Sequence, residues 1–159
     1  MSTIHVASGV GVAPTEMAAY DAALADANLH NYNLVTVSSI VPAEADVEQV
    51  DTAPDLGPAG NRLTVVQARD VAEPGADVDE LAAGLGWATG PGPGLFYEVS
   101  GGDRDGVRSA IHDGLDAGAE LRDWELTDRE LCVESAEPVE DAYTCVIVLA
   151  AYGESEPIL

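Results

Sequence analysis

The chain of 159 residues contains no lysine, and its basic residues with a permanent charge are six arginines. A pyridoxal-phosphate enzyme binds its cofactor through a lysine Schiff base, and a Walker-type phosphate loop also requires a lysine. The sequence therefore excludes both kinds of site. We expect no pyridoxal phosphate in this protein.

Positive charge is scarce in general, because 29 Asp and Glu residues give a formal net charge of −23. Such a charge opposes binding to nucleic acids and to anionic membrane surfaces, and it favours cationic ligands. The acidic residues are spread along the whole chain, which is typical of proteins in a high-salt cytoplasm, where salt screens their repulsion. We therefore expect a cytoplasmic protein with no nucleic-acid partner and no membrane partner.

Cysteine, histidine and long apolar runs are also rare. Cys132 and Cys145 lie in separate predicted strands, and we expect two buried thiols rather than a disulfide. His5, His30 and His112 match no metal-binding spacing, so no metal site is expected. The first residues lack the basic and apolar regions of a signal peptide, and no apolar run approaches the roughly 20 residues that span a bilayer.

Residues 1–159 are predicted to form one folded domain, because hydrophobic residues make up 47% of the chain and the mean hydropathy is +0.05. Apolar residues recur every three or four positions over residues 16–27 and 103–120, which predicts two helices with Thr15 and Asp103 as N-caps. Strands are predicted over residues 4–8, 31–42, 47–50, 63–71, 81–89, 95–99, 124–134 and 142–152. This order predicts an α+β layered domain with a mixed or antiparallel sheet.

The glycine-rich segment Gly9–Pro14 is predicted to be a turn between the first strand and the first helix. A dinucleotide-binding loop occupies such a place, but Pro14 stands where that pattern needs glycine or alanine. The remaining elements also do not alternate between strand and helix. We therefore interpret this segment as a structural turn.

The pair Ser38-Ser39 is unusual because it interrupts a β-branched stretch. Taken alone, the pair fits two hydroxyl groups on opposite faces of a strand, each with a local hydrogen bond. A Ser-His-Asp triad is not indicated, since no Gly-x-Ser-x-Gly elbow surrounds either serine. The residues by themselves leave a structural and a chemical role open.

From about Ala7 to Tyr152, the chain resembles the pyruvoyl-dependent arginine decarboxylases. The matching stretches, whose order and separation form a specific signature, are residues 19–24 (AYDAAL), 33–45 (NLVTVSSIVPAEA), 95–98 (LFYE) and 122–126 (RDWEL). The resemblance implies a four-layer α/β/β/α sandwich and a trimer whose sites lie between neighbouring subunits.

The resemblance also implies a cofactor made from the chain itself. The hydroxyl oxygen of Ser39 attacks the carbonyl of Ser38, and the resulting ester breaks by β-elimination. The products are a β-chain of residues 1–38 and an α-chain of residues 39–159 that begins with a covalent pyruvoyl group. This ketone is an electron sink for decarboxylation of arginine to agmatine, and it replaces pyridoxal in a chain without lysine.

Individual roles follow from the same resemblance. Asn33 aligns with the family asparagine that assists self-cleavage, as an amide donor to the oxyanion formed at Ser38. Glu98 aligns with the catalytic acid, and its neighbours Leu95, Phe96 and Tyr97 are expected to desolvate it. Asp21 aligns with the carboxylate that pairs with the substrate guanidinium. Glu44 belongs to the motif without an assigned role.

Two other functions remain open at the level of the sequence. The chain could be a pyruvoyl decarboxylase for another cationic or small amino acid, because the sequence indicates the cofactor precursor more firmly than the substrate. It could also be an uncleaved, non-catalytic acidic subunit with a regulatory or assembly role.

Overall fold

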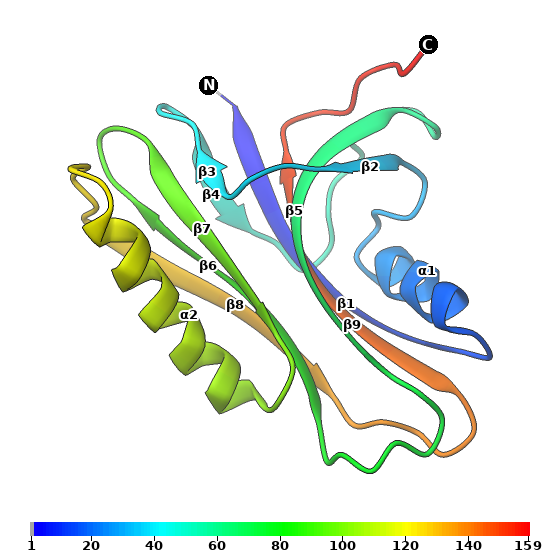
Figure 1. Ribbon diagram of the computed structural model, residues 1–159. Coiled ribbons are helices and arrows are strands. Elements are labelled where there is room, and N and C mark those ends of the chain that lie inside the picture. Colours follow the sequence, from blue (N-terminus) through cyan, green and yellow to red (C-terminus); the bar gives the residue numbers. More distant parts are fainter. Residues whose placement is uncertain (1) are drawn as a thin grey trace.

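The computed structural model describes residues 2–159, which contain two helices and nine strands (Figure 1). In chain order the elements are β1 Thr3–Ala13, α1 Glu16–Asp26, β2 Asn33–Thr36, β3 Ile40–Val41, β4 Asp46–Gln49, β5 Arg62–Ala72, β6 Leu81–Thr89, β7 Gly94–Ser100, α2 Arg104–Glu120, β8 Asp128–Ala136 and β9 Tyr143–Tyr152.

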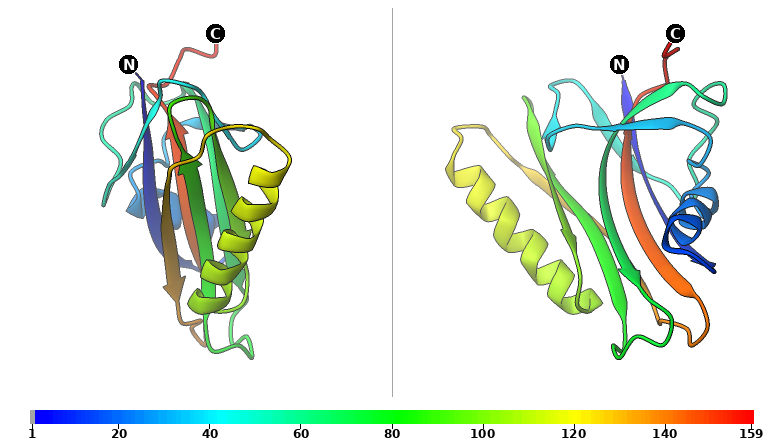
Figure 2. Two further views of the ribbon diagram at one scale, coloured as in Figure 1. Left: turned by 90° about the vertical axis from the view of Figure 1, so that its left-hand side faces the viewer. Right: turned by 45° about the vertical axis from the view of Figure 1, so that its right-hand side comes forward.

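The strands form two stacked sheets. The five-stranded sheet has the order β2-β5-β9-β1-β4, and the four-stranded sheet has the order β3-β7-β6-β8. Helix α1 covers the outer face of the five-stranded sheet and α2 covers the outer face of the four-stranded sheet (Figures 1 and 2). The five-stranded sheet mixes parallel and antiparallel pairs. The predicted α/β/β/α sandwich is therefore confirmed.

Three apolar interfaces hold these layers together: between α1 and the five-stranded sheet, between the two sheets, and between the four-stranded sheet and α2. Between the sheets, Trp87 and Leu85 of β6 pack against residues of β1, β5 and β9. Under α2, Val107, Ile111 and Leu115 are buried against the four-stranded sheet. Each fully buried side chain of this size contributes roughly 1.5–3 kcal/mol to folding. The interfaces make the sandwich a rigid frame for the segments at its ends.

Both predicted helix starts are confirmed. The Thr15 hydroxyl oxygen accepts a hydrogen bond from the Ala18 N–H, and the Asp103 carboxylate accepts one from the Gly106 N–H at 2.7 Å. Each cap satisfies an amide that the first helical turn leaves without a partner.

The prediction of a turn at Gly9–Pro14 is wrong, because β1 continues to Ala13 and pairs with β9 from Ile4 to Ala13. Gly9 and Gly11 lie directly under α1. A Cβ atom would lie 2.1 Å from the Ala23 carbonyl oxygen at Gly9 and 2.3 Å from the Ala19 carbonyl oxygen at Gly11. These glycines therefore let the helix backbone approach the sheet rather than bend the chain.

The prediction of one buried strand over residues 31–42 is also wrong. The chain forms β2 and β3 in different sheets and crosses between them at residues 37–39, near the upper end of Figure 1. The side chains of Val35, Val37 and Ile40 are 40%, 37% and 37% exposed. Likewise, the strand predicted over residues 124–134 begins only at Asp128. The β-branched residues within 31–42 predicted a buried strand. A segment that crosses between two sheets is covered on one side only, so its side chains stay partly exposed.

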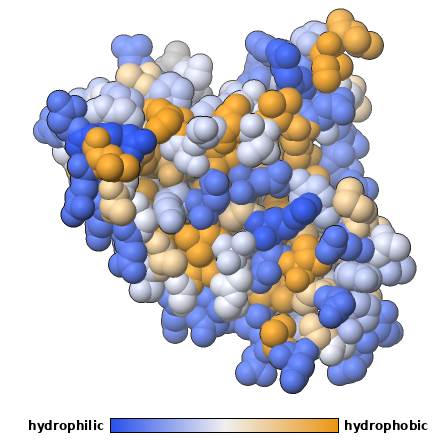
Figure 3. Space-filling model, in the orientation of Figure 1, coloured by the Kyte–Doolittle hydropathy of each residue, from blue (hydrophilic) through white to orange (hydrophobic). Residues whose placement is uncertain are grey.

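Both cysteines are buried free thiols, as predicted. Burial raises the pKa of each thiol to about 11, so both stay protonated at neutral pH. Within residues 2–159, no helix is both long and apolar enough to cross a bilayer. On the face shown in Figure 3, hydrophobic surface appears as separate areas between hydrophilic side chains.

Candidate active site

Ser38 and Ser39 lie at the point where the chain leaves one sheet for the other. Before them, the Val37 N–H donates to the Val65 carbonyl of β5 in the five-stranded sheet. After them, Ile40 pairs with Leu95 of β7 in the four-stranded sheet. Ser38 is exposed and Ser39 is half-buried. The peptide bond between them is thus accessible and is held by a different layer on each side.

The hydroxyl group of Ser39 has a carboxylate partner, Glu98, which lies 59 residues further along the chain. The Ser39 Oγ donates a hydrogen bond to the Glu98 Oε2 at 3.0 Å. A serine hydroxyl is a weak nucleophile by itself and becomes active when a neighbouring group takes its proton. Glu98 is within reach of that proton.

The carbonyl groups around the two serines are also hydrogen bonded. The Ser38 carbonyl oxygen accepts from the Ile40 N–H at 2.9 Å, and the Ser39 carbonyl oxygen accepts from the Phe96 N–H at 2.8 Å. An amide donor on a carbonyl oxygen withdraws electron density and stabilises the negative charge that develops there during nucleophilic attack. A hydroxyl group with a proton acceptor therefore lies next to a polarised carbonyl.

Glu98 lies in the middle of β7 and is exposed within the single chain. Side chains alternate across a strand, so Leu95 and Tyr97 turn toward α2, where Leu95 is buried in the core and Tyr97 lies against Gly114. Of the three neighbours expected to desolvate Glu98, Phe96 alone shares its face of the sheet. The apolar surroundings predicted from sequence neighbours are not formed within one chain.

Tyr152, at the end of β9, is a site residue that sequence reasoning missed. Its hydroxyl group donates to the Ile40 carbonyl oxygen at 2.7 Å, and its ring lies 6.0 Å from the Phe96 ring, centroid to centroid. Burial and, to a lesser degree, the negative charge of Glu98 raise the pKa of Tyr152 to about 12. No sequence signal distinguishes this tyrosine, since it completes a regular apolar strand.

The side chain of Asn33 bonds to the loop before β5. Asn33 begins β2, and its side-chain Nδ2 donates to the Gly60 carbonyl oxygen at 2.8 Å. The structure describes no hydrogen bond from this amide to Ser38, although both lie in residues 2–159. In this arrangement, the Asn33 side chain connects the start of β2 with the loop that precedes β5.

Asp21 lies on a different layer from the serines. It is exposed on α1, which covers the outer face of the five-stranded sheet, whereas Glu98 belongs to the four-stranded sheet. Figure 1 shows α1 and the β3–β7 pair on opposite sides of the sandwich. One chain therefore does not bring Asp21 together with Ser39 and Glu98.

Glu44 lies in the turn after β3 and adopts a left-handed backbone conformation with φ 71°. The turn is closed by a hydrogen bond from the Ala45 N–H to the Pro42 carbonyl oxygen at 3.2 Å. It borders a cavity of about 470 Å³ that Tyr152 also lines. Glu44 is thus near the site but has no contact with its reacting groups that would assign a role.

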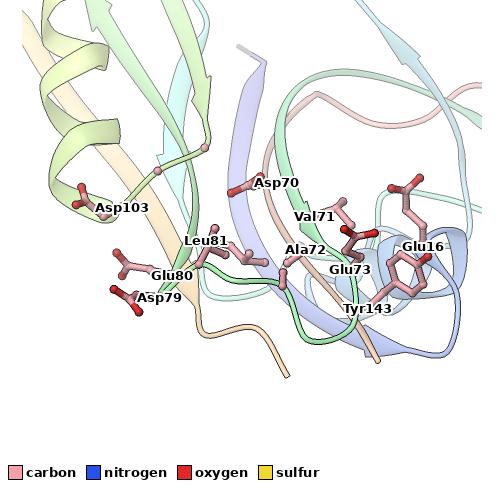
Figure 4. Close-up of a pocket in the computed structure, with 14 residues that line it drawn as sticks. Glu16, Asp70, Val71, Ala72, Glu73, Asp79, Glu80, Leu81, Asp103 and Tyr143 are labelled. Atoms are coloured by element: carbon pink, nitrogen blue, oxygen red, sulfur yellow. The ribbon is translucent and has the colours of Figure 1, made fainter. Parts of the chain in front are cut away.

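A second, acidic cavity of about 860 Å³ lies at the other end of the sandwich, beside the start of β6 and the end of β7. Figure 4 shows its carboxylates on both sides of the opening, with Asp79, Glu80 and Asp103 near α2 and Glu16 and Glu73 near α1. None of the predicted site residues lines it. Among residues 2–159, no three His, Cys, Asp or Glu side chains are grouped so as to hold a metal ion.

Comparison with known proteins gives consistent matches over this whole arrangement. The sequence model of a family described as pyruvoyl-dependent arginine decarboxylase matches residues 3–157. A protein of that name from Halobacterium salinarum is 52% identical over 161 residues, which cover 99% of this chain and 98% of the relative. A protein of the same name from Thermococcus sibiricus is 33% identical, and the match covers 75% of this chain and 75% of the relative. One from Pyrococcus horikoshii is 34% identical, and the match covers 77% of this chain and 76% of the relative.

Proposed function

The chain belongs to the pyruvoyl-dependent arginine decarboxylases, and from this premise we propose that it converts L-arginine to agmatine and carbon dioxide after cutting its own backbone between Ser38 and Ser39. The observation that carries the proposal is the pair of contacts at the cut. The Ser39 hydroxyl donates to Glu98, and the Ser38 carbonyl oxygen accepts from the Ile40 N–H.

The residues at this position fit the formation of a pyruvoyl group. Ser39 Oγ attacks the Ser38 carbonyl carbon, its proton passes to Glu98, and the peptide bond breaks to leave an ester and a free amino group on residue 39. Loss of the residue 39 Cα proton then breaks the Cβ–O bond and releases Ser38 as a carboxylate. Water replaces the nitrogen of the dehydrated residue, which leaves as ammonia. A pyruvoyl group remains at the start of chain 39–159.

During turnover, the protein residues hold the substrate and move protons. When present, the pyruvoyl ketone supplies an electron sink for the loss of carbon dioxide. Glu98 lies beside residue 39 and delivers a proton to the substrate carbon that has lost its carboxylate. The Phe96 N–H holds the Ser39 carbonyl oxygen and so fixes the backbone of residue 39 against β7. No metal ion or pyridoxal phosphate takes part in this scheme.

Substrate recognition requires more than one copy of the chain. Asp21 pairs with the arginine guanidinium, but α1 and the Ser39–Glu98 pair belong to opposite layers of a single chain. A neighbouring copy can present its α1 to this site and also cover the exposed Glu98. This placement calls for an oligomer, and we propose a homotrimer of cleaved protomers with sites between subunits, as the resemblance to the family implies. Asn33 assists the cut from its place at the start of β2.

The composition supports a high-salt cytoplasm as the working environment. Against a net charge of −23, the ion pairs in residues 2–159 are Arg62–Glu156, Arg104–Glu134 and Arg129–Asp116. Most carboxylates therefore lack a cationic partner and depend on dissolved salt for screening. The relative from Halobacterium salinarum is compatible with this environment.

The direct test of the function is the mass and activity of the purified protein in molar KCl. Two chains, residues 1–38 and residues 39–159 with a pyruvoyl start, support the proposal, together with release of carbon dioxide from arginine. Reduction with cyanoborohydride and ammonium converts the pyruvoyl group to alanine, and the resulting mass change distinguishes self-cleavage from proteolysis, which leaves serine. A single chain of 159 residues that resists this reduction would refute the proposed decarboxylase function.

Asp21→Asn is expected to raise KM for arginine roughly tenfold or more, because the neutral amide keeps the shape but loses the charge-assisted hydrogen bonds to the guanidinium. Initial rates of carbon dioxide release measure KM for arginine, ornithine, lysine and histidine. Asp113→Asn removes the same charge from an exposed position of α2 and serves as the control. Preference of the parent for an amino acid other than arginine, or an unchanged KM in Asp21→Asn, would contradict the role of Asp21.

A further inference from the structure

Tyr152 makes a hydrogen bond across the sandwich at the point of cleavage. It is the last residue of β9 in the five-stranded sheet, and its hydroxyl group reaches the Ile40 carbonyl oxygen of β3 in the four-stranded sheet at 2.7 Å. Its ring packs beside Phe96, whose N–H holds the Ser39 carbonyl oxygen. Tyr152 therefore contacts the residue immediately after the one that becomes the pyruvoyl group.

The segment that Tyr152 holds has little other support. β3 is two residues long and lies at the edge of its sheet, where it pairs with β7. Ile40 itself is 37% exposed. Yet Ile40 supplies the N–H that polarises the Ser38 carbonyl, so the direction of this N–H matters for the attack. A bond to the Ile40 carbonyl restrains the residue from its other side.

The phenol of Tyr152 stays protonated at neutral pH and can donate a hydrogen bond. Burial first, and the charge of Glu98 second, raise the pKa of Tyr152 to about 12. The hydroxyl proton is therefore retained through the neutral range, and the group cannot act as a proton acceptor in the reaction. The protonated phenol can therefore keep its hydrogen bond to the Ile40 carbonyl oxygen.

We propose that Tyr152 is a positioning residue for the reactions of residue 39. Its hydroxyl group holds Ile40 so that the Ile40 N–H stays on the Ser38 carbonyl oxygen while the chain is cut. After the cut, the same bond keeps residue 39 between Phe96 and Glu98 for decarboxylation. This inference rests on the proposed function and adds a residue from the opposite sheet to it.

The first test is the rate of self-cleavage in Tyr152→Phe, which keeps the ring that packs on Phe96 and removes only the hydroxyl group. Full-length protein made by cell-free translation in molar KCl starts uncut, and intact mass then follows the appearance of residues 39–159. Loss of one oriented hydrogen bond is expected to slow the cut about threefold to tenfold. Tyr20→Phe, which removes the hydrogen bond from the Tyr20 phenol on α1 to Gln67 of β5, is the matched control and should cut at the parent rate.

The second test separates positioning from a loss of stability. On folded, cleaved protein, with sites counted by reduction with cyanoborohydride and ammonium, Tyr152→Phe should lower kcat severalfold and leave KM for arginine unchanged, because Tyr152 contacts the chain rather than the substrate. A merely structural role would lower the melting temperature by circular dichroism and leave kcat per site intact.

The outcomes distinguish this inference from the function on which it rests. A parent protein that does not cut itself would refute the proposed function. A parent that cuts, with Tyr152→Phe within twofold of it in both cleavage rate and kcat per site, would refute the role of Tyr152 alone.

Discussion

Ser39→Ala is expected to remain a single chain of 159 residues and to lose decarboxylase activity to the background level. The Ser39 Oγ is the group that attacks the Ser38 carbonyl, and alanine offers no oxygen for this step and no precursor of the ketone. Intact mass after purification in molar KCl measures the cut, and release of carbon dioxide from arginine measures turnover. The hydrogen bond to Glu98 is lost at the same time.

Ser38→Ala is the matched control for this experiment. Ser38 contributes its backbone carbonyl, which alanine keeps together with the hydrogen bond from the Ile40 N–H. Its side chain is at the exposed position next to the cut. This variant should still produce two chains, whereas two chains from Ser39→Ala would show that another residue starts the cleavage.

Glu98→Gln is expected to lower kcat per cleaved site about 10²-fold to 10⁴-fold, the range that general acid–base groups contribute. In the uncut chain glutamine can still accept a hydrogen bond from the Ser39 hydroxyl, but in the cleaved site it cannot take up or deliver a proton at neutral pH. The cut itself should also be slower, because Glu98 is the partner of the Ser39 hydroxyl. Steady-state rates on protein whose pyruvoyl content has been counted separate the two effects.

Glu120→Gln provides the control for charge, since Glu120 is an exposed carboxylate at the end of α2. It reduces the net charge by the same amount and should leave kcat at the parent value. A Glu98→Gln protein with full kcat would remove this carboxylate from the proton transfer and leave the proposed mechanism without its acid.

Local signals in the sequence predicted much of the fold because they depend on near neighbours. Thr15 and Asp103 cap the helices as predicted, and β6 spans residues 81–89 as predicted. Gly9 and Gly11 were misinterpreted, since a glycine that bends a chain and a glycine that admits a helix look alike in sequence. The difference depends on α1, which packs on them only in three dimensions.

The candidate site was harder to predict than the fold. Ser39 and Glu98 meet across two sheet elements that are 59 residues apart, and resemblance to a family, rather than spacing, indicated that both matter. The sequence does not indicate Tyr152, because its contact with Ile40 depends on the register of β9 against β1 and on how the two sheets pack together. The single chain leaves Glu98 exposed and Asp21 on the opposite layer, and in the proposed oligomer a neighbouring copy would complete their surroundings.

The place of β1 within the five-stranded sheet has a consequence for the cleaved protein. β1 lies between β9 and β4 and pairs with β9 from Ile4 to Ala13, so after the proposed cut chain 1–38 would stay in the sandwich, with backbone hydrogen bonds in place of a covalent link. Folding of the uncut chain is a unimolecular process, whereas reassembly of the two cleaved chains is bimolecular and depends on their concentration. A molecule cut at the proposed bond that unfolds in dilute solution would therefore lose its partner chain, so this topology favours a chain that folds before it is cut.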